Sequence, residues 1–232
     1  MARWRALSIE MGGMLIVILW AAFLAIRLHR APSEAEWPQD AGPDHVGELL
    51  TVDGARTRGS SNASVVVIVF TDYQCPFCAR FALRSLPTVV RRYVDDGRVR
   101  IAVLNSPIAA HAMAVRAAEA GECAGQEGRF WEMHDRLFRN QASLSAERID
   151  GLWAEVGLDS GRLVACRIAG EMLAKVKRQA EIAREFDLKG TPTIAIGRAI
   201  GSVSRVLIRQ RFDGVPTDDV LTAGLEKALD GR

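Results

Sequence analysis

Two cysteines separated by two residues are the feature of this sequence best suited to chemistry. The segment Cys75-Pro-Phe-Cys78 could exchange a disulfide with other thiols, or it could supply half of a zinc site. A zinc ribbon needs a second pair, whereas Cys123 and Cys166 stand alone and the four histidines show no ligand spacing. A purely structural disulfide across so short a loop would remove little chain entropy. The pattern therefore favours a redox-active pair and no metal.

A strand followed by a helix is expected to position this pair. Residues 65–70 (VVVIVF) form a continuous apolar run, typical of a central strand that is covered on both faces. A helix is predicted from residue 79 to about 94, which places Cys75 at its N-terminus, where unpaired N–H groups and the helix dipole favour a thiolate. Pro76 suits the first turn because its missing N–H would have no partner there. Cys75 is then predicted to be the exposed attacking sulfur and Cys78 the more buried, resolving one.

The segment from Phe70 to Cys78 resembles the active-site signature of the DsbA-like thiol:disulfide oxidoreductases, a branch of the thioredoxin fold. The similarity continues to Gly190-Thr-Pro-Thr193 and covers about residues 63–197. It implies an α/β thioredoxin fold with an inserted helical subdomain at about 107–185. It also implies that Pro192 is a cis proline beside the cysteines.

The resemblance implies supporting roles around the cysteine pair. Pro76, Phe77, Thr191 and Pro192 are expected to support the site, with the backbone of Thr191 offering polar groups to an extended substrate segment. From sequence alone, a proline at the head of a strand marks either an edge or a special turn.

Helical structure is expected between the cysteine pair and the segment Gly190–Thr193. Four stretches show helical periodicity, and the fourth is predicted to be one long helical stretch: 107–122, 128–139, 146–156 and 161–186. An aromatic stripe around His134 is interpreted as packing rather than as a cofactor site. A strand at 99–104 is expected to lie parallel to 65–70, with the intervening helix as the crossover.

Cys123 and Cys166 lie in this helical region. Relatives often carry cysteines at both places, so the resemblance implies a structural disulfide that would close a loop of about 44 residues and contribute about 4 kcal/mol. Two buried thiols acting as small apolar residues are the alternative, and a relay to the active pair is a third interpretation.

The sequence departs from the family at three places, two of which bear on the site. Val69 stands where many relatives carry an acidic residue, and Phe77 stands where strongly oxidising relatives have histidine. In relatives the acidic residue is thought to help protons leave the buried thiol, and Phe77 can donate nothing to the thiolate. We therefore expect a weaker oxidant than the strongest family members. Residues 198–211 are also unusually long and basic for a family that usually turns quickly there, whereas a final helix at 217–229 is ordinary.

The N-terminus predicts the compartment. Residues 11–26 carry no charge and are flanked by arginines, which favours an uncleaved membrane anchor over a cleaved signal peptide within residues 1–30. Residues 31–45 are expected to be a flexible tether and 46–232 the folded domain. The cysteine chemistry favours a bacterial cell envelope location, with the domain in the periplasm or outside, or secreted if the N-terminus is cleaved.

The sequence as a whole predicts a thiol:disulfide oxidoreductase that acts on extracytoplasmic proteins, with oxidation as the favoured direction. A formal charge of +2 gives no reason to expect nucleic acid. The expected partners are unfolded or cysteine-containing proteins and a membrane redox partner, and the redox-active disulfide makes a cofactor unnecessary. A reductase or isomerase using the same site, and a non-catalytic membrane-tethered peptide-binding or chaperone module, remain as alternatives.

Overall fold

The structure is a computed structural model that describes residues 46–231, with the backbone alone at Ser202 and Val203. The expected anchor (1–30) and tether (31–45) lie outside the described residues. Among the residues that are described, no helix is both long and apolar enough to cross a membrane.

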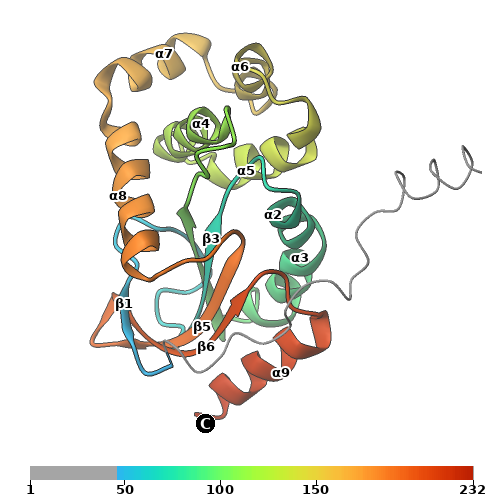
Figure 1. The fold of residues 1–232 in the computed structure, drawn as a ribbon, viewed down its shortest axis with the longest axis vertical. Helices are drawn as coiled ribbons and strands as arrows, with labels where there is room; N and C mark the ends of the chain where they lie inside the picture. The colour runs from blue at the N-terminus through green and yellow to red at the C-terminus, as the bar shows by residue number, and fades with distance from the viewer. Residues whose placement is uncertain (1–45, 232) are drawn as a thin grey trace, which may run out of the picture. The chain divides into compact units, whose positions relative to one another are not determined.

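A mixed sheet forms the centre of the described chain (Figure 1). Its central strand, β3 (Val65–Thr71), is buried along its whole length, as its apolar run predicts. The second expected strand, β4 (Val99–Asn105), pairs with it in parallel, and β5 (Thr193–Ile200) pairs with it on the other side in antiparallel. The order across the sheet is β1 (Leu49–Thr51), β6 (Ser202–Asp213), β5, β3, β4 and β2 (Arg56–Arg58).

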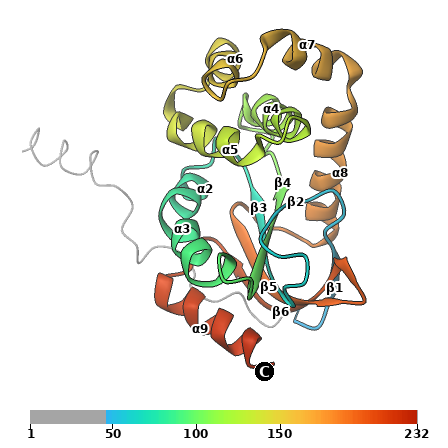
Figure 2. The ribbon, with the colours of Figure 1, turned by 180° about the vertical axis from the view of Figure 1, so that it is seen from behind.

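Successive side chains of β3 pack into two different hydrophobic cores, one on each face of the sheet. Val65, Val67 and Val69 pack with the crossover helix and with α9 (Asp218–Leu229). Val66, Ile68 and Phe70 pack toward α8 (Glu171–Glu185) on the opposite face. Figures 1 and 2 show these helices on the two sides of the sheet. The alternation of the strand therefore explains why an unbroken apolar run is needed.

The crossover helix begins three residues earlier than predicted, at Pro76. It runs to Val94 through α2 (Pro76–Arg80), a π-helical turn η2 (Phe81–Ser85), α3 (Leu86–Val89) and a second π-helical turn η3 (Val90–Val94). Pro87 lies just after the first π turn, and a proline in a regular helix removes one hydrogen bond and crowds the preceding turn. The wider turn accommodates it.

A helical lobe occupies the chain between β4 and β5. It consists of α4 (Ala114–Gln126), α5 (Phe130–Arg139), a short η4 (Gln141–Ser143), α6 (Ala146–Glu155), α7 (Ser160–Ala169) and α8. Helices α4 to α7 gather beyond one end of the sheet, and α8 returns along its side (Figure 2).

Two boundaries in this lobe differ from the prediction. The helix expected from residue 107 begins only at Ala114, because residues 106–113 form a loop that contacts the active-site turn. The stretch expected at 161–186 is two helices, because Gly170 adopts a left-handed conformation with φ +71° and ends α7 there.

A buried carboxylate joins this lobe to the sheet. Glu122 of α4 is fully buried, and its Oε2 lies 2.6 Å from Arg56 Nε and 2.7 Å from Lys175 Nζ. The amides of Asn105 and Gln179 donate to its other oxygen. No local pattern in the sequence marks this network, whose members come from β2, β4, α4 and α8.

Candidate active site

Cys75 caps the N-terminus of the crossover helix. It is the N-cap residue of α2, Pro76 occupies the first helical position, and the Cys75 N–H donates to the carbonyl oxygen of Asp72 at 3.1 Å. The prediction that Cys75 is exposed is wrong, because only 4% of it is accessible, against 1% for Cys78. Both cysteines are free thiols, packed in the core of the helical lobe. Cys75 remains the more accessible of the two.

The loop that precedes β5 covers Cys75. The Thr191–Pro192 peptide bond is cis, and the Cys75 thiol donates to the carbonyl oxygen of Thr191 at 3.0 Å. Antiparallel pairing of Phe70 with Thr193 brings the two segments together. Because β5 lies between β3 and β6, Pro192 marks a special turn and not a sheet edge.

The environment separates the acidities of the two thiols. The hydrogen bond from Cys78 is the largest cause that lowers the pKa of Cys75, to about 6. The side chain of Thr191 and the N–H groups of Cys78 and Phe77 lower it further, against the opposing effect of burial. Burial, followed by the interaction with Cys75, raises the pKa of Cys78 well above its ordinary value. Cys75 is therefore the thiol suited to attack and to leave as a thiolate.

Asp72 is a site residue that the sequence analysis missed. Its carboxylate accepts from the N–H of Gln74 at 2.6 Å and from the N–H of Ile108 at 2.7 Å, and lies 2.9 Å from His111 Nδ1. Its own N–H donates to Cys78 Sγ at 3.4 Å. The only local signal is an aspartate at the start of a turn, where its side chain commonly binds the N–H two residues on. The partners from 106–113 have no such signal.

Gln141 is a second missed residue. Its Nε2 donates to the carbonyl oxygens of Tyr73 and Cys75, each at 2.8 Å. Since Gln141 belongs to η4, the helical lobe also holds the turn that carries Cys75. Nothing in the sequence near Gln141 points to this contact.

The other residues singled out from the sequence either pack in the core or form a disulfide. Phe77 is half-buried and packs against two of the core clusters, while Val69 lies in the apolar core beside the crossover helix. Cys123 and Cys166 form a disulfide that links α4 to α7, with their Cα atoms 6.0 Å apart. His134 is buried against aromatic rings, as the packing interpretation predicts.

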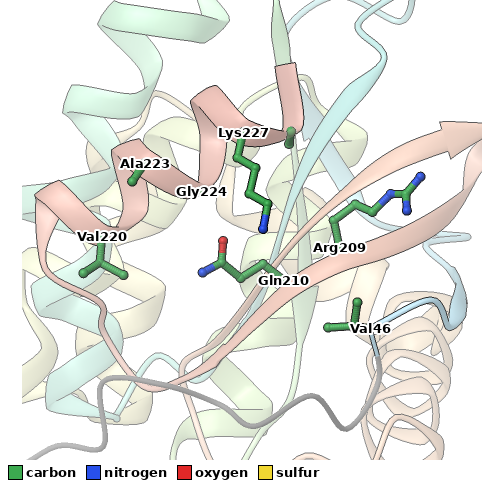
Figure 3. Close-up of a pocket in the computed structure, with 8 residues that line it drawn as sticks. Val46, Arg209, Gln210, Val220, Ala223, Gly224 and Lys227 are labelled. Atoms are coloured by element: carbon green, nitrogen blue, oxygen red, sulfur yellow. The ribbon is translucent and has the colours of Figure 1, made fainter. Parts of the chain in front are cut away.

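A separate hollow of about 530 Å³ lies between β6 and α9 (Figure 3). Its lining includes Arg209, Gln210 and Lys227, but neither Cys75 nor Cys78. The thiol chemistry is therefore placed at the strand–helix junction and not in this hollow.

Comparisons with known proteins agree with this geometry. A family model described as thioredoxin (Thioredoxin_4) matches residues 51–204. The disulfide bond formation protein D of Bacillus subtilis is 25% identical over 166 residues, which cover 68% of this chain and 74% of that protein. The crystal structure of the thiol-disulfide exchange protein alpha-DsbA2 from Wolbachia pipientis has a TM-score of 0.63 at 17% identity, covering 80% of this chain and 90% of that one. The expected α/β thioredoxin fold with a helical insertion is thereby confirmed.

This chain also matches part of a much longer protein. The Na(+)/H(+) antiporter NhaA 1 of Salinispora arenicola is 31% identical over 166 residues, which cover 68% of this chain but only 22% of the antiporter. This chain thus spans about a fifth of the length of that relative. The similarity concerns a segment of it and transfers no transport function.

Proposed function

The chain belongs to the DsbA-like branch of the thioredoxin family, and from that premise we propose that it is a disulfide oxidoreductase whose reactive pair is Cys75 and Cys78. The observation that carries the proposal is the position of Cys75, which caps a helix N-terminus, contacts the cis-proline loop and has a pKa lowered to about 6 by hydrogen bonds, first of all from Cys78. The family works through a redox-active disulfide, so the proposed reaction needs no further cofactor.

Oxidation is the direction we propose. A substrate thiolate attacks Sγ of Cys75 in the oxidised pair, the Cys75–Cys78 bond breaks, and Cys78 leaves and takes up a proton. The second substrate thiolate then attacks the substrate sulfur of the mixed disulfide, and Cys75 leaves as a thiolate. The substrate loses two electrons and the enzyme gains them. The low pKa of Cys75 favours this last step because a more acidic thiol is a better leaving group.

The substrate and the reoxidising partner follow from the same site. The backbone of Thr191, beside the thiol, suits an extended, cysteine-containing segment of an unfolded protein. We place the domain (46–232) in the periplasm or outside the cell, held by an anchor within residues 1–30, where a membrane redox partner would restore the disulfide. Labelling intact spheroplasts with an impermeant thiol reagent would test this placement. Labelling of Cys75 only after lysis would contradict it.

Oxidation of a reduced, unfolded protein by the full chain tests the activity. Wild type, oxidised beforehand, should introduce disulfides into the substrate, and Cys75→Ala should not. Peptide binding should survive in Cys75→Ala because that change leaves the cis-proline loop in place. If wild type binds peptide without turnover in either direction, the chain is a binding module. If it turns over only as a reductant or isomerase, the proposed direction is wrong.

A further inference from the structure

A buried arginine lies beneath the loop that carries Thr191. Arg211 of β6 is 4% exposed, and its guanidinium donates to the carbonyl oxygens of Phe186 and Asp187, each at 3.0 Å. The same group lies over the Phe186 ring, 4.9 Å from its centroid. These carbonyls end α8, so a buried cation is held at the helix C-terminus, where it is favoured by the dipole.

A β-bulge turns this arginine toward the loop. Gln210 pairs with Ile196 and Ile208 pairs with Gly197, which leaves Arg209 as the extra residue. Ile208 packs toward α8, whereas Phe212 packs toward α9. In a regular strand both would face one side, and Arg211 would face α9. The bulge reverses the alternation and directs Arg211 to the side of α8.

The arginine also reaches the other end of the loop. Its Nε donates to Asp213 Oδ1 at 2.8 Å, and the same oxygen lies 3.2 Å from Thr193 Oγ1. Thr193 Oγ1 in turn lies 2.9 Å from the carbonyl oxygen of Gly190. Arg211 therefore contacts the residues before the cis proline directly and those after it through Asp213.

Between these two anchored ends lies the residue that faces the reactive thiol. The carbonyl oxygen of Thr191 is 3.0 Å from Cys75 Sγ, and the Thr191 hydroxyl is buried. A loop that is loosened at both ends would hold Thr191 less firmly, and hydrogen bonds weaken steeply with poor distance and angle. We propose that Arg211 is a positioning residue for the thiol chemistry, because it holds Thr191 in place against Cys75.

Positioning by Arg211 should affect the redox equilibrium between the disulfide and dithiol forms of the Cys75–Cys78 pair. This consequence rests on the proposed role of Cys75. The carbonyl oxygen of Thr191 accepts from the neutral thiol, whereas the Thr191 side chain lowers the pKa of Cys75 and so favours the thiolate, which exists only in the reduced enzyme. Losing the effect of that side chain makes the reduced form less stable and the disulfide a weaker oxidant. A change at Arg211 should therefore alter the redox equilibrium even though Arg211 touches neither cysteine.

Arg211→Gln and Arg211→Lys test this inference. The thiolate of Cys75 is followed by ultraviolet absorbance against pH, with Cys75→Ser as the baseline, and the redox equilibrium is measured against glutathione. In Arg211→Gln we expect the ratio of thiolate to thiol at pH 6 to fall about tenfold, which is about one pKa unit. The glutathione equilibrium should move by a similar factor toward the disulfide, about 30 mV. Arg211→Lys keeps the charge but loses the planar guanidinium that donates to several acceptors at once. Its shifts in both readouts should lie between those of wild type and Arg211→Gln.

Three controls separate positioning from general stability. Arg209→Gln changes the same residue type at an exposed place two residues away, on the wall of the hollow in Figure 3, and should leave both readouts unchanged. Leu225→Ala lowers stability by removing a buried side chain of α9 and should leave the Cys75 titration unchanged. Asp213→Asn keeps the shape of the loop and should move both readouts as Arg211→Lys does. It serves in place of Arg211→Gln if that variant does not fold.

The possible failures are distinguishable. Arg211 and Asp213 variants that titrate and equilibrate like wild type would overturn the role of Arg211 while leaving the proposed activity intact. A wild-type Cys75 that titrates as an ordinary thiol, in a chain that transfers no disulfides, would instead contradict the proposed function itself. A shift in Leu225→Ala as large as that in Arg211→Gln would also overturn the positioning role.

Discussion

The thiol of Cys75 lies 3.0 Å from the carbonyl oxygen of Thr191, although 116 positions separate them in the chain. The contact joins the N-terminus of the crossover helix to the loop between α8 and β5. Central strand pairing between β3 and β5 creates it. The sheet therefore fixes the position of the reactive thiol. Its chemistry depends on the residues that hold the Thr191 loop against the start of the crossover helix.

The redox potential should be intermediate within the family. Hydrogen bonds, with that from Cys78 the largest, lower the pKa of Cys75 to about 6, which lies between about 3.5 in DsbA and about 7 in thioredoxin. A less stabilised thiolate makes a weaker oxidant, so we expect a potential between roughly −270 and −120 mV. Equilibration with glutathione measures it. A value at or above the DsbA figure would contradict the weaker thiolate.

Stability of the reduced protein should depend on pH in a defined direction. Folding lowers the pKa of Cys75 from its ordinary value near 9 to about 6, so its contribution is fully present above pH 9 and is lost as pH falls through 6. The free energy of unfolding of the reduced form minus that of the oxidised form should rise between pH 5 and pH 8.5, by at most about 4 kcal/mol. Urea denaturation at several pH values checks this, and Cys75→Ser should remove the slope.

Asp72→Asn should loosen the turn that presents the cysteines. The carboxylate accepts from the N–H groups of Gln74 and Ile108, and an amide offers only one oxygen in its place. An N–H left without an acceptor costs about 1–3 kcal/mol, measurable by urea unfolding. Asp96→Asn, which removes an exposed carboxylate beside Arg98, is the matched control. Equal effects of the two changes would argue against a special role for Asp72.

Glu122→Gln should be among the most destabilising single changes. It leaves the cations Arg56 and Lys175 without their shared carboxylate in a buried site, at a cost of about 3–5 kcal/mol. Glu127→Gln breaks an ion pair with the exposed Arg162 and should cost no more than about 1 kcal/mol. Thermal and urea unfolding compare them. A small effect at Glu122 would mean that the site admits water.

The Cys123–Cys166 disulfide should act as a brace and not as a relay. It closes a loop between residues 43 positions apart, so replacing both cysteines by alanine should lower stability by about 4 kcal/mol. Disulfide transfer by the folded variant should match wild type. A loss of turnover with retained stability would favour the relay.

Local patterns in the sequence determined the chemistry and the order of the main elements. An apolar run predicts β3, and the Cys75-Pro-Phe-Cys78 motif marks the helix start, because each depends on neighbouring residues alone. A proline before a strand marks either an edge or a special turn, and the strand order decides between them. The helix after Gly170 was misjudged because periodicity continued across a residue that breaks the helix.

Only the tertiary structure decided how this chemistry is controlled. Burial of Cys75 depends on Thr191, and the contacts of Asp72 with residues 106–113 and of Gln141 with the turn are made between segments that the chain order does not bring together. The face of the sheet on which Arg211 lies depends on a β-bulge. The bulge shifts the alternation of side chains along β6, and no residue type in the strand announces it. Pairing register and packing are non-local, so no local pattern encodes them.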